Sequence, residues 1–406
     1  MTKDYMKEMN KPLTPLLAME EASRCLLCLD APCSKACPAG TDPAKFIRSV
    51  RFKNVKGAAC TVRINNPLGA VCARVCPTER YCELGCSRSG IDKPINIGAI
   101  QRYITDNEEA FDLDILEAGK DTGKRVAIVG SGPSALSLAA LLREDGHQVE
   151  LFEKEAKLGG YLRYGIPEYR LPTPVLDKEI KRILDLGVKA NLNVFVDQKK
   201  LEELKKEFDA VVLANGNSKG KMLPIFEGHK NVRIAVDLLK EIRDSKGNIN
   251  LPDNIVVVGG GDVAMDVVTS LKLLGVKHVT DVVYETLDEF KASKKELDGA
   301  RDVKVSILDG YVPTAFDGIK VSFKHRFLNA ELIIDADMVV LAVGQVTDLG
   351  NMDVELERGE VKCPNYRVCD TNMFFVGDIS HNEKTVVYAV KSAKEARKQI
   401  NDFLGE

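Results

Sequence analysis

An α/β fold, in which two similar βαβ units follow a helical and cysteine-rich N-terminal segment, is predicted by three features of the 406-residue sequence. Eight cysteines fall in two groups within the first ninety residues, where strand-like alternation is absent. A short apolar strand pattern, a glycine-rich turn and a helix pattern follow one another at 125–144. The same succession returns 129 residues later. Each succession is typical of a dinucleotide-binding domain, so two such domains are predicted.

The cysteine groups indicate iron–sulfur clusters. The first group ends in a Cys-Pro pair and comprises Cys25, Cys28, Cys33 and Cys37. The second comprises Cys72, Cys76, Cys82 and Cys86. A Cys-x2-Cys run that ends in x3-Cys-Pro resembles the ferredoxin-type pattern, whose last cysteine binds a neighbouring cluster. Zinc sites use paired Cys-x2-Cys hairpins, of which this chain has one, so two [4Fe–4S] clusters are favoured over two zinc sites.

The ferredoxin rule also distributes the ligands, because the last cysteine of each group crosses to the other cluster. The first cluster then takes Cys25, Cys28, Cys33 and Cys86. The second takes Cys37, Cys76 and Cys82 and lacks one ligand, for which Cys72 is the obvious candidate.

Composition narrows the class of protein. The chain is 45% hydrophobic and 29% charged, as in ordinary globular proteins. It has no apolar run long enough to span a membrane, and the segment Met1–Lys11 lacks the apolar core of an export signal, so a cytoplasmic protein is expected. Residues 1–104 carry 16 Lys or Arg and 9 Asp or Glu, whereas the whole chain has a net charge of −3. We attribute this basic excess to compensation of anionic clusters rather than to nucleic-acid binding.

The first βαβ unit spans a strand at 125–129, a turn and a second strand at 148–152. Its turn contains Gly130, Gly132 and Ala135, and Glu153 follows the second strand, 23 positions after the first glycine. An acidic residue at this distance is the one that binds the ribose of a dinucleotide.

The second unit spans strands at 254–258 and 279–284 and ends with Glu285, 24 residues after Gly261. A carboxylate there accepts hydrogen bonds from the ribose hydroxyls and repels a 2′-phosphate, which favours NADH over NADPH. The stretch 284–290 contains no arginine for a 2′-phosphate. Lys291, Lys294 and Lys295 lie just beyond it, so NADPH stays the alternative. The residues predicted to bind NAD are Gly259, Gly261, Asp262, Ala264, Glu285 and Gly344.

Several segments resemble the family of flavoproteins that bind two dinucleotides. They are Gly159-Gly160, the run 164–172, Ala214-Asn-Gly216 and the run 371–378. The resemblance implies FAD at the first unit, with Asp378 on the ribityl chain and a helix N-terminus near Thr385 facing the flavin. The residues it implies for FAD are Gly130, Gly132, Ala135, Glu153, Gly160, Arg170, Gly216, Gly377, Asp378, Thr385 and Val386.

The flavin motifs lie on both sides of the second βαβ unit, so an NAD(H) domain inserted in a split FAD domain is expected. The predicted segments are a helical iron–sulfur domain at 1–119, FAD-binding segments at 120–222 and 341–406, and an NAD(H)-binding domain at 223–340.

The segments 65–69, 75–77 and 94–101 closely resemble the N-terminal domain of dihydropyrimidine dehydrogenases. That resemblance implies Gln101 as the eighth cluster ligand, which would make the second set Cys37, Cys76, Cys82 and Gln101. An amide oxygen in place of a thiolate makes the cluster less anionic and should raise its reduction potential. Cys72 stays the alternative, and with Gln101 as ligand Cys60, Cys72, Cys363 and Cys369 become small buried apolar residues.

The function expected from these motifs is electron transfer. NADH gives a hydride, a cluster accepts one electron, and a flavin can do both, so the flavin must lie between them. Hydride transfer needs positioning rather than a proton donor, and no catalytic acid or base is assigned. The predicted domains use all 406 residues, so the electrons are expected to leave to a separate subunit through the cluster domain.

The resemblance extends over nearly the whole chain to the FAD/NADH subunit of bacterial NAD-dependent dihydropyrimidine dehydrogenase. It implies a hetero-oligomer with a TIM-barrel subunit that carries FMN and further clusters and reduces uracil or thymine. The alternatives are the glutamate synthase small subunit and the NADPH-side subunit of bifurcating transhydrogenases, which both carry arginines for NADPH. A dithiol reductase would need cysteines that 223–340 lack, and a nucleic-acid-binding cluster protein would leave both dinucleotide units unexplained.

Overall fold

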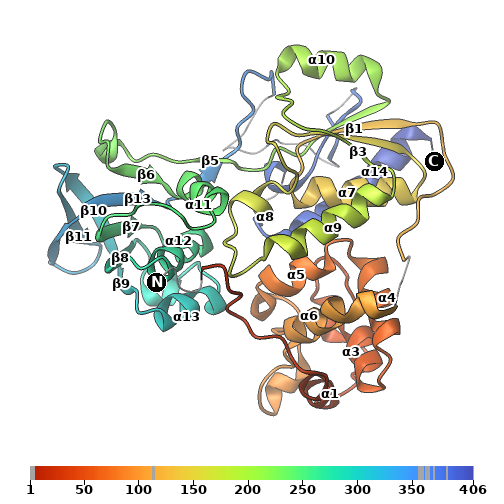
Figure 1. Ribbon diagram of the computed structural model, residues 1–406, viewed down its shortest axis with the longest axis horizontal. Helices are drawn as coiled ribbons and strands as arrows, with labels where there is room; N and C mark the ends of the chain where they lie inside the picture. The colour runs from red at the N-terminus through yellow and green to blue at the C-terminus, as the bar shows by residue number, and fades with distance from the viewer. Residues whose placement is uncertain are drawn as a thin grey trace. The chain divides into compact units, whose positions relative to one another are not determined.

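The computed structural model describes residues 5–111, 115–354, 361, 366–368, 371–380 and 383–405 (Figure 1). The chain divides into two compact units. Unit 1 comprises Met1–Met9, Arg163–Pro172 and Asn217–Val346. Unit 2 comprises Asn10–Leu162, Thr173–Gly216 and Thr347–Glu406. Within the described ranges, no helix is both long enough and apolar enough to cross a membrane.

The N-terminal part of unit 2 is helical, as predicted, and residues 5–111 contain no strand. Its longer helices are α1 (Pro15–Ser23), α3 (Pro43–Arg51), α4 (Val55–Asn65), α5 (Gly69–Val75) and α6 (Ile97–Asn107). Short helices lie between them, namely α2 (Pro32–Lys35), η1 (Thr78–Arg80), η2 (Ser87–Gly90) and η3 (Glu108–Phe111). Side chains of Thr14, Asp42, Asn54 and Asn96 cap four of the longer helices by accepting hydrogen bonds from the first turn. These helices share one apolar core, against which Cys25, Cys33 and Cys86 pack.

The rest of unit 2 is a parallel sheet in the order β15-β4-β1-β2-β3. Its strands are β1 (Arg125–Val129), β2 (Gln148–Phe152), β3 (Lys189–Asn191), β4 (Ala210–Leu213) and β15 (Met373–Phe375). The helices are α7 (Pro133–Glu144), α9 (Thr173–Asp185), α10 (Gln198–Glu207) and α14 (Val386–Leu404). Helix α8 (Tyr161–Tyr164) begins in unit 2, and its last two residues belong to unit 1. The last strand and helix come from the C-terminal end of the chain, so this sheet is assembled from two separate parts of the sequence, as the flavin motifs predict.

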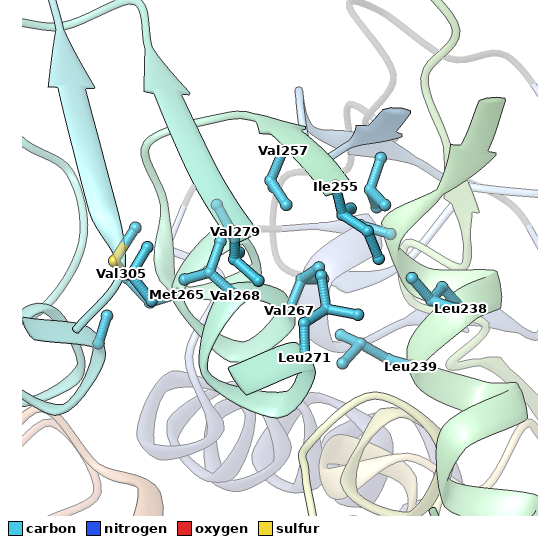
Figure 2. Packing of buried hydrophobic residues seen from close by; sticks show 14 of the residues in the cluster. Leu238, Leu239, Ile255, Val257, Met265, Val267, Val268, Leu271, Val279 and Val305 are labelled. Carbon is cyan, nitrogen blue, oxygen red and sulfur yellow. The ribbon is translucent and has the colours of Figure 1, made fainter. Parts of the chain in front are cut away.

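Unit 1 is built on a second parallel sheet, in the order β6-β13-β7-β8-β9. Its strands are β6 (Val232–Ile234), β7 (Asn254–Val258), β8 (His278–Val283), β9 (Ser306–Asp309) and β13 (Met338–Leu341). One face packs on α11 (Ala235–Asp244), α12 (Asp262–Leu273) and α13 (Lys294–Asp302). Figure 2 shows this core, in which Ile255 and Val257 of β7 meet Val267 and Leu271 of α12.

The other face of this sheet is covered by an antiparallel sheet that the sequence analysis did not predict. It consists of β10 (Tyr311–Phe316), β11 (Lys320–His325) and β12 (Glu331–Asp335). Val321 and Phe323 of β11 are buried against Val256 and Val258 of β7. A short antiparallel pair, β5 (Lys219–Gly220) with β14 (Gln345–Val346), lies where the chain enters and leaves unit 1.

Unit 1 also contains Arg163–Pro172, which the sequence analysis placed in the FAD-binding segment 120–222. The buried contacts of this stretch explain the difference. Arg243 of α11 donates hydrogen bonds to the carbonyl oxygens of Arg163 and Leu171. Arg170 forms ion pairs with Asp266 of α12 and Glu296 of α13. The domain boundaries at 119, 222 and 340 stay predictions.

Candidate functional site

One pocket in unit 2 gathers the four cysteines predicted to bind the first cluster. Cys25, Cys28, Cys33 and Cys86 all line it. The other lining residues are mostly apolar and include Ile47, Ile95 and Ile97. Left-handed backbone at Leu27 and Ala31 turns the loop between the first three cysteines, and α2 begins at Pro32. The fold thus brings Cys33 and Cys86 to one pocket although they lie 53 positions apart in the sequence, and their binding of one cluster stays a prediction.

The chemistry of this pocket fits a cationic cluster core. Burial raises the pKa of the Cys33 thiol to about 11, and the neighbouring thiols of Cys86 and Cys25 add to the shift. Thiolates crowded in an apolar pocket therefore need a metal to compensate their charge. Among the described residues, no three His, Cys, Asp or Glu side chains converge closely enough to hold a single metal ion. A [4Fe–4S] core binds each thiolate at a different iron, so its ligands stand apart around the core.

A second group of thiols surrounds Cys76, at the end of α5. Burial raises the pKa of Cys76 well above its usual range, and Cys72, Cys82 and Cys37 contribute as neighbouring thiols. The three cysteines predicted for the second cluster therefore lie together in unit 2. Cys72 lies with them, since its pKa is raised to about 12 by burial and further by Cys37.

Gln101 lies beside the same helix. It is 7% exposed on α6, and its Nε2 donates a hydrogen bond of 2.8 Å to the carbonyl oxygen of Gly69, the first residue of α5. Cys72 thus belongs to α5, and Gln101 contacts the first residue of the same helix. The identity of the eighth ligand stays a prediction. Of the other cysteines, Cys60 is half-buried, and Cys363 and Cys369 lie outside the described residues.

The glycine turn after β1 is built for close backbone approach. Gly130 has φ +107°, and a Cβ atom there would lie 2.6 Å from the carbonyl oxygen of Ala214. A Cβ on Gly160 would lie 2.8 Å from the Cα of Gly132. A Cβ on Gly132 itself would meet nothing within 4 Å, so there is open space at the N-terminus of α7. A helix N-terminus bordered by open space suits a pyrophosphate.

Three further groups surround this turn. Glu153 is buried and accepts hydrogen bonds from the Ser131 hydroxyl and from the backbone N–H of Glu155. A Cβ on Gly377 would lie 2.4 Å from Ser134 Oγ, which brings the start of η7 (Gly377–Ile379) against the first turn of α7. Asp378 follows directly, and Lys384 donates a hydrogen bond to its carbonyl oxygen.

Asn215 was missed as a candidate. Its Oδ1 is buried and has no hydrogen-bond partner in the described part of the chain. It follows β4, between Ala214 and Gly216, and an unpaired buried acceptor is costly unless a ligand satisfies it. The motif Ala214-Asn-Gly216 contains this asparagine, but the sequence analysis assigned Gly216 and not Asn215 to FAD. These observations together fit a dinucleotide such as FAD at the turn.

The second glycine turn follows β7 in unit 1. A Cβ on Gly259 would lie 2.5 Å from the carbonyl oxygen of Ala342, and a Cβ on Gly260 would lie 2.9 Å from Glu285 Oε2. The Glu285 carboxylate therefore lies over the turn, at the place predicted for a ribose. It forms an ion pair of 2.5 Å with Lys291. Asp262, at the start of α12, accepts a hydrogen bond from the backbone N–H of Ser293.

An arginine lies beside Glu285 in space although none lies beside it in the sequence. The Arg326 guanidinium is 4.0 Å from the centre of the Tyr284 ring and donates to the Tyr284 carbonyl oxygen. It also donates to Glu289 Oε2 over 2.9 Å. Its charge is therefore already paired with a carboxylate. The β11–β12 connection brings it there, and no local pattern could have indicated this.

Arg170 was predicted to bind FAD, and its ion pairs lie within unit 1. It is 8% exposed in unit 1, and Asp266 accepts two hydrogen bonds from its Nη1, over 2.6 and 2.7 Å. Glu296 pairs with its other terminal nitrogen over 2.9 Å. Two carboxylates thus occupy both terminal nitrogens, and the assignment of Arg170 to FAD stays a prediction.

Two nucleotide turns and two thiol groups in one chain define a flavin-type pyridine-nucleotide oxidoreductase with iron–sulfur clusters. The family model described as dihydropyrimidine dehydrogenase domain II, 4Fe-4S cluster, matches residues 2–112. The model for pyridine nucleotide-disulphide oxidoreductases matches residues 124–396. The chain belongs to the family of NAD-dependent dihydropyrimidine dehydrogenase subunits. Its cofactors are FAD, NAD(H) and [4Fe–4S] clusters, as the sequence predicted.

Two relatives place the chain within this superfamily. The NAD-dependent dihydropyrimidine dehydrogenase subunit PreT of Escherichia coli O157:H7 is 51% identical over 403 residues, which cover 99% of this chain and 98% of the relative. The glutamate synthase (NADPH) small chain of Halomonas elongata is 30% identical over 444 residues, which cover 98% and 93%.

Two solved structures share the fold of the nucleotide-binding part. FprA from Mycobacterium tuberculosis matches 70% of this chain and 85% of its own, with a TM-score of 0.62 and 18% identity. Thioredoxin reductase from T. acidophilum matches 69% and 98%, with a TM-score of 0.54 and 17% identity. The predicted class of two-dinucleotide fold is therefore confirmed.

Proposed function

We propose that this chain oxidises NADH and passes the electrons singly to a separate subunit that carries FMN and iron–sulfur clusters and reduces uracil or thymine. The overall reaction is uracil plus NADH plus a proton giving 5,6-dihydrouracil and NAD+. The name of the 51% identical relative supports the pyrimidine as substrate. FAD, when bound, supplies the change from hydride to one-electron chemistry.

The residues have distinct tasks in this proposal. In unit 1, Glu285 holds the ribose of NADH, and the N-terminus of α12 faces the pyrophosphate. In unit 2, the turn from Gly130 to Gly132 and the end of β4 hold FAD. The first cluster is held by Cys25, Cys28, Cys33 and Cys86, and the second by Cys37, Cys76, Cys82 and Gln101.

The observation that carries the order of transfer is the contact between α14 and the loops of the second thiol group. Tyr81 directly precedes Cys82, and its ring lies 5.7 Å from that of Tyr388 in the first turn of α14. Lys394 of the same helix donates to the carbonyl oxygen of Ala39, two residues after Cys37. The N-terminus of α14 is assigned to the flavin, so the second cluster is the nearer one and the first cluster is the exit.

The test is reconstitution without air. We expect the chain, co-purified with an FMN- and iron–sulfur-containing subunit of this family, to reduce uracil at the expense of NADH in a one-to-one ratio. Uracil left unchanged while NADH still reduces the bound flavin would contradict the assigned acceptor. NADH-dependent formation of glutamate with a glutamate synthase large subunit would instead support the alternative indicated by the 30% identical relative.

A further inference from the structure

Helix α3, the loop after it and the first turn of α4 carry an uncompensated positive charge. Residues 43–78 include seven Lys or Arg and no Asp or Glu. Two of the seven are neutralised inside the protein, since Arg63 pairs with Glu108 and Glu179 and Arg74 pairs with Asp106. The other five form no ion pair within the described residues. We call them the basic face: Lys45, Arg48, Arg51, Lys53 and Lys56.

Helix α3, which carries Lys45, Arg48 and Arg51, borders the first cluster's pocket. Ala44 and Ile47 of α3 line that pocket, and Phe46, Ile47 and Val50 are buried in the surrounding core. Lys45 and Arg48, three residues apart, are exposed on the side of the helix that faces away from Phe46, Ile47 and Val50. One helix therefore contacts the cluster pocket with one side and presents cations to solvent with the other.

Compensation of the cluster's own charge does not explain these cations. Arg51 is suited to that task, because it is half-buried and donates a hydrogen bond of 3.0 Å to the carbonyl oxygen of Cys25. Lys45, Arg48, Lys53 and Lys56 are exposed, and water screens an exposed cation from a buried cluster. A partner with complementary charge would use them instead.

Apolar side chains are exposed on the loop after α3 and on the cysteine loop between α1 and α2. Phe52 directly follows Arg51 and is 68% exposed. Leu26 follows Cys25 and is 43% exposed, and Leu29 follows Cys28 and is 102% exposed. Large apolar side chains together with cations are typical of protein interfaces, whereas a nucleic-acid surface needs mainly cations and hydrogen-bond donors.

We propose that the basic face and these three apolar side chains form the docking surface for the electron-accepting protein, which presents an acidic surface around its own one-electron centre. The occupant rests on the proposed function, in which the first cluster is the exit. The acidic character of the partner rests on the charge of the basic face alone. Attraction between opposite charges also orients the encounter, so that the exit cluster faces the acceptor.

The test reverses charge at two exposed positions and compares it with a matched change elsewhere in unit 2. The test variant is Lys45→Glu/Arg48→Glu. The control is Lys199→Glu/Lys206→Glu on α10, where both lysines are exposed and form no ion pair among the described residues. Binding to the FMN- and iron–sulfur-containing subunit is measured by analytical ultracentrifugation at low and high salt.

We expect the test variant to weaken binding at low salt by about ten-fold or more and the control to change it by less than about two-fold. Iron content and NADH-driven reduction of menadione, a neutral acceptor, should stay unchanged in both variants. Equal binding by the test variant and the wild type would overturn the docking surface while leaving the proposed reaction intact.

If the proposed function is wrong, the FMN subunit should bind neither the wild type nor the variants. If the FMN subunit binds no form of the chain, the same two variants are compared for binding of an acidic bacterial ferredoxin. Loss of that binding only in the test variant would uphold an acidic protein partner, and no difference would overturn it. Binding of a labelled DNA duplex that depends on Lys45 and Arg48 at physiological salt would also overturn the proposal.

Discussion

Gln101 Nε2 donates a hydrogen bond of 2.8 Å to the carbonyl oxygen of Gly69, and this bond fixes the glutamine amide at the first turn of the helix that carries Cys72. The amide oxygen accepts no hydrogen bond from the part of the chain that the structure describes, so it is available as a ligand. The nitrogen's bond to a backbone group sets the orientation of that oxygen, as outer hydrogen bonds do for many metal ligands.

Substitution at these two positions should therefore have opposite outcomes. We expect Cys72→Ala to retain the full iron content, whereas Gln101→Ala should lose iron or alter the EPR spectrum of one reduced cluster. Gln101→Cys should keep the cluster and lower its potential, because an added thiolate makes it more anionic. Iron loss in Cys72→Ala together with an unaltered Gln101→Ala would identify Cys72 as the ligand.

Replacing the carboxylate over the second glycine turn should weaken the selectivity for NADH. In Glu285→Gln the carboxylate that repels a 2′-phosphate and forms an ion pair with Lys291 is removed, so the rate of flavin reduction by NADPH should rise. Loss of charged hydrogen bonds of about 1.5–3 kcal/mol should lower kcat/KM for NADH by roughly ten- to a hundred-fold. Stopped-flow absorbance gives the rate of flavin reduction by NADH and by NADPH for each variant. The matched control is Asp288→Asn, an exposed acid in the short helix Leu287–Glu289 just after Glu285, which should leave the ratio of the two rates unchanged.

Local patterns predicted the parts of the site that local backbone geometry builds. Each glycine turn was identifiable because a strand, a close approach and a helix N-terminus must follow in that order. The crossing of Cys86 to the first group was predicted because clusters need four ligands. The contacts of Arg326 and Arg170 depend instead on segments that are distant in the sequence, so no local pattern indicates them. The antiparallel strands β10–β12 carry no motif, and their alternation is too short to show which sheet they cover.

Arg63 should be the most sensitive residue for the stability of unit 2. It is 1% exposed and holds Glu108, next to the cluster helices, and Glu179 of α9. Arg63→Met would leave two buried carboxylates with less compensation and should lower the free energy of unfolding by about 3–5 kcal/mol. Arg182→Met removes a half-exposed arginine from the same two carboxylates and should have a clearly smaller effect. Chemical denaturation followed by flavin fluorescence compares the two variants. Equal losses would contradict the central position of Arg63.

The same network should make the protein sensitive to acid. Burial alone would raise the pKa of Glu108, but the charges and hydrogen bonds of Arg63 and Arg182 hold it below its ordinary value. A lowered folded-state pKa contributes stability above the unfolded value, about 4.3, and that stability is lost as pH falls toward the folded value. We expect the unfolding midpoint of the wild type to fall more steeply below pH 5 than that of Glu108→Gln. Parallel curves would contradict this contribution.

Asp281, in unit 1, should have the opposite effect on the pH dependence of stability: its contribution should fall as pH rises. It lies in β8 with 0% exposure, and neither carboxylate oxygen has a hydrogen-bond partner among the described residues. Burial is the cause that raises its pKa well above the ordinary value. Above about pH 4 the unfolded chain ionises this group while the folded protein keeps it protonated, so the contribution to stability falls as pH rises.

Two substitutions separate the charge of Asp281 from its polarity. Asp281→Asn removes the ionisation and should flatten the pH dependence of the unfolding temperature above about pH 4. Asp281→Val also removes the unsatisfied polar atoms and should raise the free energy of unfolding by about 1–3 kcal/mol. Differential scanning calorimetry of the FAD-loaded protein measures the unfolding temperature of each variant. Unit 1 should either unfold in a transition of its own or shift the transition that it shares with unit 2. A destabilised valine variant would mean that the carboxyl group has a partner in solution, and the NADH titration of that variant would show whether the partner is the nucleotide.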